Sequence, residues 1–507
     1  MNVHSIFSPR RQRILWVTFS LLLQLGLLVV IILRFNRYFV TFYSLCVVVS
    51  AGVSLFISTR RSKLAYKVAW VVPILIFPLF GGLMYLFLGG GRRPRGPTKE
   101  EMREIVRREL PRDIPREAER FGPDVLQMVR YLQNAALCPA YTGTETRYFS
   151  SGEAWYPVFL EELKSARRYL FLEYFLVAEG SLWEEVLEIL VRKAVEGVEV
   201  YLLYDGVGSA ATLPLHYDRR LEALGIHCRV FRPFRPVLSI HQNNRDHRKL
   251  CVIDGVTGFV GGLNLADEYV GRRERFGYWR DNALLLRGDA VWSLAVSFLS
   301  MWETAGDREP VDYAPFQPGF VPKGEGRGIV VPYADTPLWE DTVSADLIHM
   351  MALKANEYLY LTTPYLILDE TLTSALCTAA RSGVDVRILT PHIPDKKRVF
   401  AVTRSQYPGL LAAGVRVFEF TPGFTHTKTV VADGRWATVG SCNLDYRSLY
   451  LQYENGVFLC GDPAVKAVEE DFLAAAERSQ EITLADCRRS LPYRLLCAVY
   501  RLFSPLF

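Results

Sequence analysis

The chain has 507 residues, of which 50% are hydrophobic, with a formal net charge of +5. This length exceeds one ordinary domain and can bury more than one core. The modest positive charge fits an anionic membrane surface or an anionic substrate, but it does not indicate nucleic acid. The nine cysteines are odd in number, scattered and without zinc-type spacing, which favours reduced, buried thiols over disulfides.

Three apolar segments open the chain and predict a membrane anchor over residues 1–91. Segments 14–33 and 38–57 are each about 20 residues long and carry no charge, so each can cross the hydrocarbon core as a helix. The third, 68–88, contains two prolines and a Gly-Gly pair, and we expect it to lie in the interface or to re-enter. A cleavable signal peptide is disfavoured, because the first apolar run is too long and a second follows at once.

Basic residues flank these segments and bear on topology. Arginines precede the first segment at 10–13, and basic residues follow the second at 60–67, which predicts a cytoplasmic N-terminus and an external hairpin at 34–37. A complete third crossing would place the rest of the chain outside, whereas the arginines at 92–95 favour the inside. We therefore predict a multi-pass protein of the cell membrane, with the rest of the chain cytoplasmic.

The remainder divides into a linker and two halves. Residues 92–145 are predicted to be a juxtamembrane linker, rich in charge and proline at first, with one short charged helix at 98–110. The first half covers 146–310, a Pro/Gly-rich linker covers 311–330, and the second half covers 331–507. The second half ends in an amphipathic tail, for which packing on the domain and lying on a bilayer are both open.

The two halves repeat one pattern of apolar strands and amphipathic helices, which is typical of an α/β domain. The strand predicted at 169–175 corresponds to 358–365, and the helix–Gly–strand segment around 197–203 corresponds to 383–389. Several matched features in one order indicate a duplication. The predicted fold is therefore α/β, with two tandem halves, each a mixed sheet flanked by helices, related by a pseudo-twofold axis.

One motif occurs once in each half with identical spacing, H-x-K-x4-D-x6-G-(G/S)-x-N. The first copy comprises His247, Lys249, Asp254, Gly262 and Asn264, and the second comprises His426, Lys428, Asp433, Ser441 and Asn443. Strand alternation places the His and Lys of each copy on one face. If the halves pack about a pseudo-twofold axis, two imidazoles, two ammonium groups and two carboxamides meet beside small residues that let an anion approach. Such a cage suits the oxygens of a phosphodiester.

The paired imidazoles predict metal-free phosphodiester chemistry, with no cofactor. One histidine, neutral, attacks phosphorus, while the other, protonated, gives its proton to the leaving alcohol. Each needs an acid that fixes its tautomer, and we expect Asp281 to serve His247 and Glu454 to serve His426. Asp254 and Asp433 complete the motif, but turn or structural bonding is their favoured role.

Structural explanations compete with this interpretation. A single H-x-K motif would fit a satisfied core histidine better, but two copies with matched acids make that reading weak. The other histidines have no repeat partner and are interpreted as incidental. Cysteines inside the motifs are interpreted as small core residues.

The motifs resemble those of the phospholipase D superfamily, and specifically of bacterial cardiolipin synthases. The similarity includes residues 244–249 (NRDHRK), 258–264 (GFVGGLN), 267–269 (DEY), 276–281 (FGYWRD) and 443–448 (NLDYRS), and it extends over roughly residues 60–507. The additional apolar segment at 14–33 departs from the pattern of two such segments in many members.

This resemblance implies a membrane-bound enzyme that joins two phosphatidylglycerol molecules into cardiolipin and releases glycerol. It also implies that His247 is the nucleophile and His426 the acid and base. The partners would be phosphatidylglycerol and cardiolipin in the bilayer, without nucleic acid, and the oligomeric state is open. Alternatives are a hydrolytic phospholipase D, another phosphatidyl transferase, a nuclease of the superfamily, or a non-catalytic membrane scaffold.

Overall fold

The computed structural model describes residues 18–20, 22–30, 36–60, 63–78, 81–82, 85, 98–233, 243–306, 310–319 and 326–504. The chain forms two compact units, one built mainly from its first 93 residues and a larger one that contains both repeats. The predicted external hairpin at 34–37 falls largely outside the described residues. Each unit is described by itself.

The small unit contains a helical hairpin. Helix α2 (Asn36–Thr59) and helix α3 (Leu64–Ile76) pack against each other, and Lys67 Nζ donates to the carbonyl of Ser58 at 2.8 Å. Among the described residues, one helix, Tyr38–Thr59, is long and apolar enough to cross a membrane. The stretches Thr18–Val30 and Leu64–Ile76 are shorter apolar helices. The described residues thus contain one candidate span, whereas the sequence predicted two crossings and an interfacial segment, and part of the first predicted crossing, 14–33, lies outside the described residues.

The first half of the large unit is a seven-stranded mixed sheet in the order β1-β8-β6-β5-β2-β3-β4. Its strands are β1 (Glu145–Phe149), β2 (Tyr169–Tyr174), β3 (Glu199–Asp205), β4 (His227–Phe231), β5 (Lys249–Ile253), β6 (Thr257–Gly261) and β8 (Ala283–Arg287). Its helices are α7 (Gly152–Ser165), α8 (Ser181–Val195), α9 (Tyr217–Ala223), the short η5 (Asp267–Val270) and α10 (Val291–Ala305). Strands β2, β3 and β4 are parallel, and the other neighbours are antiparallel.

The second half repeats this sheet and adds one edge strand, in the order β17-β12-β11-β10-β14-β15-β16-β9. Its strands are β9 (Ile329–Asp335), β10 (Tyr358–Thr362), β11 (Asp385–Pro391), β12 (Arg416–Phe420), β14 (Thr429–Ala432), β15 (Trp436–Gly440), β16 (Glu454–Cys460) and β17 (Ser479–Ile482). Its helices are α11 (Val343–Lys354), α12 (Glu370–Arg381), α13 (Lys397–Ala412), α14 (Tyr446–Leu451), α15 (Pro463–Glu477) and α16 (Leu491–Phe503). With β1 matched to β9 and β2 to β10, the strand orders coincide, which confirms the predicted duplication.

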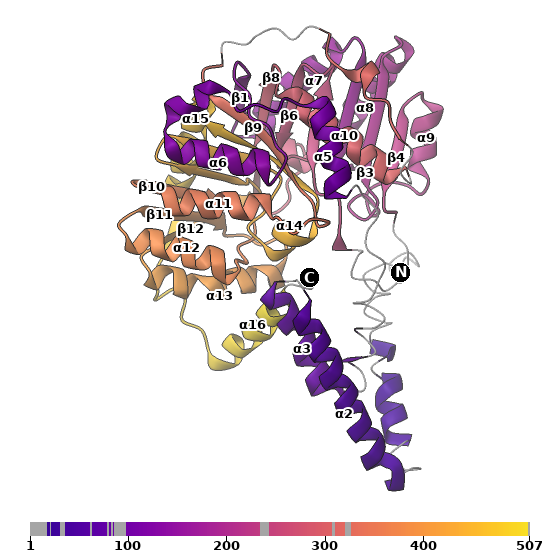
Figure 1. Ribbon diagram of the computed structural model, residues 1–507, viewed down its shortest axis with the longest axis vertical. Helices are drawn as coiled ribbons and strands as arrows, with labels where there is room; N and C mark the ends of the chain where they lie inside the picture. The colour runs from indigo at the N-terminus through magenta and orange to yellow at the C-terminus, as the bar shows by residue number, and fades with distance from the viewer. Residues whose placement is uncertain are drawn as a thin grey trace. The chain divides into compact units, whose positions relative to one another are not determined.

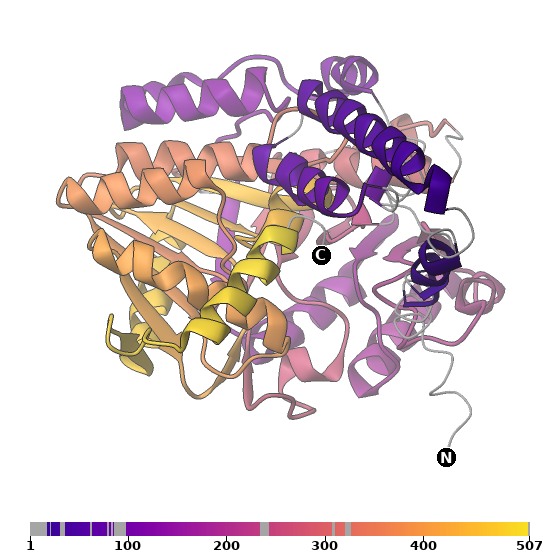
Figure 2. The ribbon, with the colours of Figure 1, turned by 90° about the horizontal axis from the view of Figure 1, so that it is seen from below.

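The two sheets share a central core and are covered on their outer faces. Helices α10 and α15 pack between the sheets together with apolar side chains from both halves. Helices α7, α8 and α9 cover the outer face of the first sheet, while α11, α12 and α13 lie side by side on the outer face of the second (Figure 1). The view from below shows the second sheet edge-on beneath these helices (Figure 2). One continuous core therefore fixes the two halves against each other.

The predicted juxtamembrane linker contributes structure of its own. The charged helix predicted at 98–110 is α5 (Lys99–Glu109), which begins at a capping box formed by Thr98 and Glu101. After the short η3 (Arg116–Phe121), helix α6 (Pro123–Asn134) buries Val125, Met128, Val129 and Leu132 in the core of the second half. This part of the stretch assigned to the linker is thus core structure, because its apolar residues recur at helical spacing.

All nine cysteines are free thiols.

Candidate active site

The two motif histidines precede equivalent central strands. His247 lies just before β5, which begins at Lys249. His426 and Lys428 lie just before β14, which begins at Thr429. All four residues are buried, with exposed fractions of 7%, 2%, 7% and 3%. The charges of Lys428 and His426 act on the ring of His247, and that of Lys249 acts on His426. Both copies of the motif therefore contribute to one site.

Each histidine is held next to a backbone segment of the opposite half. Asp246 forms a parallel bridge with Tyr453, and the N–H of His247 donates to the Tyr453 carbonyl at 2.9 Å. In the related position, β13 (Gly423–Thr425) pairs in parallel with β7 (Tyr278–Arg280), and the N–H of His426 donates to the Arg280 carbonyl at 2.6 Å. In each case the next residue of the opposite half is an acid.

The resulting His–acid pairs cross between the halves. Nδ1 of His247 lies 2.9 Å from Oε1 and 3.0 Å from Oε2 of Glu454, and Nδ1 of His426 lies 2.6 Å from Oδ2 of Asp281. The prediction that Asp281 serves His247 and Glu454 serves His426 was wrong. The acids were identified correctly, but the parallel pairings place each acid beside the histidine of the other half. Nε2 of each ring remains for chemistry.

Neighbouring residues position the two acids differently. The hydroxyl of Ser441 donates to Oε2 of Glu454 at 2.5 Å, whereas at the matching position Gly262 leaves room for Asp281. A Cβ on Gly262 would lie 2.0 Å from Oδ1 of Asp281, so any side chain there would displace the carboxylate. The small residues were expected to admit a substrate anion, but in the structure they accommodate and orient the acids.

The lysines are fixed by backbone contacts that repeat in both halves. Nζ of Lys249 donates to the carbonyl of His247, and Nζ of Lys428 donates to that of His426. The amide of Asn455 accepts from the Lys249 N–H at 3.3 Å, and that of Asn282 accepts from the Lys428 N–H at 3.4 Å. Asn282 directly follows Asp281 in the sequence, and Asn455 directly follows Glu454. Their repetition after each acid was the signal for this role.

Burial and like charges perturb the ionisation of the site. Desolvation lowers the pKa of Lys249 to about 7 and that of Lys428 to about 8, with nearby carboxylates opposing this effect. Desolvation and the lysine charges lower the pKa of His426 to about 4, although Asp281 raises it, and they lower that of His247 well below its usual value. Burial raises the pKa of Glu454, against the effects of Lys249 and Ser441. A site that destabilises its own cations favours an anionic ligand.

The motif aspartates lie in structural positions. Asp254 accepts backbone N–H bonds from Arg167, Arg168 and Tyr169 at 2.8–2.9 Å. Asp433 accepts the equivalent three bonds in the second half, from residues 356–358. Both have positive φ, 52° and 54°, at the turns after β5 and β14. These bonds favour a turn or structural role for both aspartates over direct chemistry.

The motif asparagines also bond to the protein. Nδ2 of Asn264 donates to the hydroxyl of Tyr269 at 2.6 Å, and its Oδ1 accepts from the N–H of Leu176. Nδ2 of Asn443 donates to Ser448 Oγ at 3.2 Å. They were expected to donate to the phosphodiester. In the structure each amide nitrogen gives one of its two N–H groups to a protein acceptor, so one N–H of each remains for a phosphodiester oxygen.

Aromatic rings surround the histidines, and the sequence analysis did not assign any of them to the site. The ring of Phe175 lies 4.9 Å from that of His247. The rings of Tyr269, Trp279 and Phe424 lie 5.7, 5.5 and 6.0 Å from that of His426. These residues come from both halves, and they exclude water from the imidazoles.

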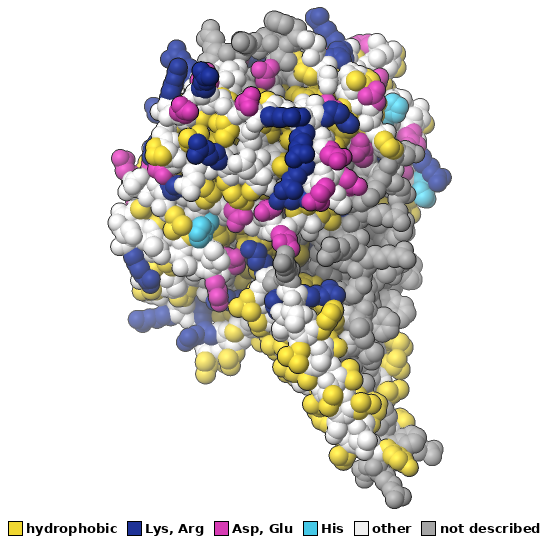
Figure 3. Space-filling view, viewed as in Figure 1, with side chains coloured by type: hydrophobic (Ala, Val, Ile, Leu, Met, Phe, Trp, Pro, Cys, Tyr) yellow, Lys and Arg dark blue, Asp and Glu magenta, His cyan; other side chains and the backbone are white. Residues whose placement is uncertain are grey.

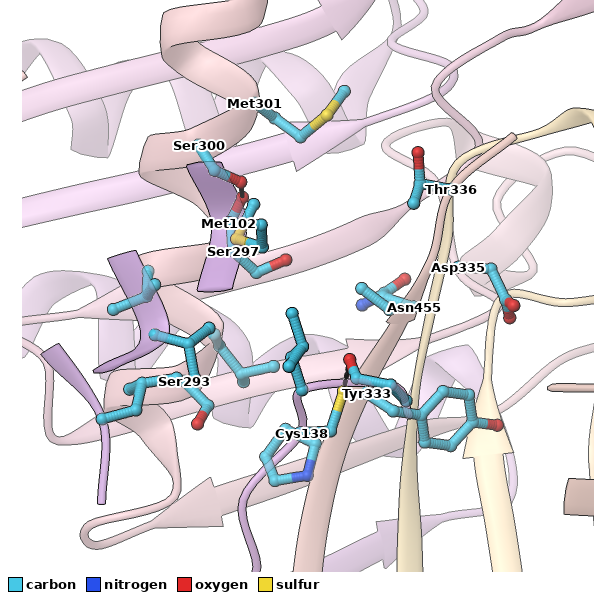
Figure 4. Close-up of a pocket in the computed structure, with 18 of the residues that line it drawn as sticks. Met102, Cys138, Ser293, Ser297, Ser300, Met301, Tyr333, Asp335, Thr336 and Asn455 are labelled. Carbon is cyan, nitrogen blue, oxygen red and sulfur yellow. Dashed lines mark hydrogen bonds between the residues drawn. The ribbon is translucent and has the colours of Figure 1, made fainter. Parts of the chain in front are cut away.

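A separate, largely apolar cavity lies between α5, α10 and β9. Arg248, whose neighbours His247 and Lys249 face the site, lines this cavity with residues of α5, α10 and β9. Figure 4 shows Ser293, Ser297 and Met301 on one side of the cavity and Tyr333 and Asn455 on the other. The histidines do not line it. The cavity is therefore separate from the site that contains the histidines.

Together these features define a two-histidine, phospholipase D-like transferase site shared by two tandem halves. The family model described as "Cardiolipin synthase, PLD-like domain" matches residues 159–288 and 347–475, and that described as "Phospholipase_D-nuclease N-terminal" matches 39–90.

Curated relatives support this assignment, and one solved structure supports the fold. A cardiolipin synthase of Geobacillus thermodenitrificans is 36% identical over 457 residues, which is 89% of this chain and 90% of the relative. Cardiolipin synthase 2 of Bacillus anthracis is 36% identical over 463 residues, or 90% of this chain and 89% of the relative. The crystal structure of the Haemophilus influenzae phosphatidylserine synthase shares the fold, with a TM-score of 0.57 at 16% identity, over 76% of this chain and all of that one.

The chain belongs to the phospholipase D-like cardiolipin synthase family and is a membrane-associated phosphatidyltransferase.

Proposed function

We propose that the protein transfers a phosphatidyl group from one phosphatidylglycerol molecule to another, giving cardiolipin and glycerol. The crossed His–acid pairs carry this proposal. Each leaves one Nε2 free in a buried site that also holds two lysines. A transfer between two alcohols needs one nucleophile and one group that first gives and then takes a proton, and the two imidazoles meet both needs.

In the first step, Nε2 of His247 attacks phosphorus and the bond from phosphorus to the glycerol oxygen breaks. Nε2–H of His426 gives its proton to that oxygen, and glycerol leaves. Desolvation and nearby positive charge lower the pKa of His247 and so keep its ring neutral, as a nucleophile requires. The diester anion offsets the lysine charges that lower the pKa of His426, so that His426 can hold its proton until transfer.

In the second step, a terminal hydroxyl of another phosphatidylglycerol gives its proton to His426 and attacks phosphorus. The phosphorus–nitrogen bond breaks, and its electron pair returns to His247. Throughout, Glu454 and Asp281 keep the Nδ1 sides of the two rings fixed, while Lys249 and Lys428 stabilise negative charge on the phosphoryl oxygens.

Product analysis tests this proposal. Purified protein in detergent would receive phosphatidylglycerol labelled in its acyl chains and in its terminal glycerol, and the lipids would be separated by head group. The proposal predicts one cardiolipin and one free glycerol for every two phosphatidylglycerol molecules consumed. Phosphatidic acid with glycerol and no cardiolipin would indicate hydrolysis instead.

We further propose a cytoplasmic catalytic unit, supported by the basic residues that flank the apolar segments at 10–13, 60–67 and 92–95. Reporter fusions after residue 504 would test this in cells. Activity of a reporter that works only in the cytoplasm supports the proposal, and activity of one that works only outside contradicts it.

A further inference from the structure

The C-terminal helix α16 carries an apolar stripe whose residues are half exposed or more. Leu491, Leu495 and Val499 recur at every fourth position, so they share one side of the helix, and their exposed fractions are 66%, 60% and 50%. Leu496 beside them is 45% exposed, whereas Cys497 is buried. The helix thus buries Cys497 and exposes four large aliphatic side chains. Such a helix suits an apolar environment outside the domain.

The other side of α16 closes a basic pocket of about 630 Å³ against α13 and the segment after β17. Its charged lining residues are four arginines and one aspartate, namely Arg404, Arg489, Arg494, Arg501 and Asp486. Glu419 accepts two bonds from Arg404, and Asp486 accepts bonds from Thr483. Among the lining residues, arginines outnumber carboxylates by four to one. A pocket of this size and charge suits a phosphate group.

Basic and apolar side chains therefore occur together on this part of the large unit. In the space-filling view, Lys and Arg side chains gather around α13 and α16, with hydrophobic side chains beside them (Figure 3). Arg494 directly precedes Leu495 and reaches the pocket from the edge of the stripe. This order matches a bilayer surface, where acyl chains meet the leucines and lipid phosphates lie one layer higher, at the level of the arginines.

We propose that α16 lies on the membrane and that the pocket beside it binds the phosphate of an anionic phospholipid, apart from the catalytic site. The exposed leucines favour a lipid phosphate over a free one, because inorganic phosphate would leave the stripe in water. The proposal does not depend on the reaction catalysed.

Hydrogen exchange of full-length protein tests this proposal. The His247→Ala variant, which is expected not to consume lipid, would be placed in nanodiscs of phosphatidylcholine with or without phosphatidic acid, and in uncharged detergent with inorganic phosphate. We expect α16 amides to exchange most slowly with phosphatidic acid present and to be unaffected by inorganic phosphate. Equal exchange in both kinds of nanodisc, or slowing by inorganic phosphate alone, would overturn the proposal. Slowing in detergent that grows with protein concentration would instead assign the face to a second copy.

Variants on the two sides of the helix give separate results. Arg494→Gln should weaken the effect of phosphatidic acid about fivefold, and Leu495→Ser should remove protection in both kinds of nanodisc. Matched controls are Arg219→Gln, at an exposed position of α9, and Leu215→Ser, where the leucine is 92% exposed. Both controls should leave α16 exchange unchanged. An Arg494→Gln protein that responds fully to phosphatidic acid would refute the role of the pocket.

Discussion

Replacement of Glu454 by Gln tests the crossed pairing of acids and histidines. The carboxylate of Glu454 is fully buried, bonds Nδ1 of His247 at 2.9 Å and accepts from Ser441 at 2.5 Å. Gln fits the same space but removes the charge and can present an N–H to the ring, which selects the wrong tautomer. We expect turnover to fall about 10²- to 10⁴-fold, equivalent to about 3–5 kcal/mol of transition-state stabilisation.

A substrate whose leaving group needs no proton shows which histidine the Glu454→Gln replacement impairs. A phosphatidyl ester of p-nitrophenol releases its phenolate without a proton, so it bypasses the general acid in the first step but still needs the nucleophile. With His247 as nucleophile, the nitrophenol burst should stay slow in Glu454→Gln and in His247→Ala. It should recover in Asp281→Asn and His426→Ala.

The comparison within each pair decides the result. Glu454→Gln should behave like His247→Ala, and Asp281→Asn like His426→Ala, whichever histidine is the nucleophile. If Glu454→Gln instead followed His426→Ala, the acids would serve the histidines of their own halves, and the crossed geometry would be refuted.

Further variants probe the support of the site. Gly262→Ala should displace the carboxylate beside it, because the new Cβ would lie 2.0 Å from an oxygen, and should lower kcat about 100-fold. Gly409→Ala, where nothing lies within 4 Å, is the matched control, and equal kcat values would contradict the expectation. Asp254→Asn should lower the free energy of unfolding by about 1–3 kcal/mol but leave kcat unchanged. Thermal melts and assays at low temperature would check this. Loss of kcat in a folded protein would argue for a chemical role of Asp254. Since Lys249 and Lys428 have pKa values lowered to about 7 and 8, they lose charge as pH rises through this range, and kcat/KM for the anionic diester should fall; a flat profile there would count against them as anion contacts.

The architecture could be predicted from the sequence because the same pattern of strands and helices occurs in both halves. Matched strands such as those beginning at Tyr169 and Tyr358 indicated the repeat. In the structure, the equivalent strands have the same order in both sheets. The histidines, lysines and acids were found for the same reason, since each type recurs at equal spacing. Helix α6 was missed because the surrounding charge and proline dominated the composition of its stretch.

The pairing of acids and histidines could not be obtained from that repeat. Equal spacing within each half says nothing about which half supplies a partner, and a twofold arrangement makes both pairings equally consistent with the sequence. The choice depends on two short backbone contacts, Asp246 with Tyr453 and β13 with β7. Aromatic contacts such as that of Trp279 with His426 were hidden similarly, because they form only when the halves meet.

Mapping of the covalent intermediate tests the central claim, that both halves form one active site with one nucleophile. Full-length protein would react for a single turnover with phosphatidylglycerol labelled at phosphorus, then be quenched in base and digested. We expect label on the peptide that contains His247, at no more than one label per chain, and none on His426. Label on His426 would contradict the assigned roles, and two labels per chain would contradict a single composite site.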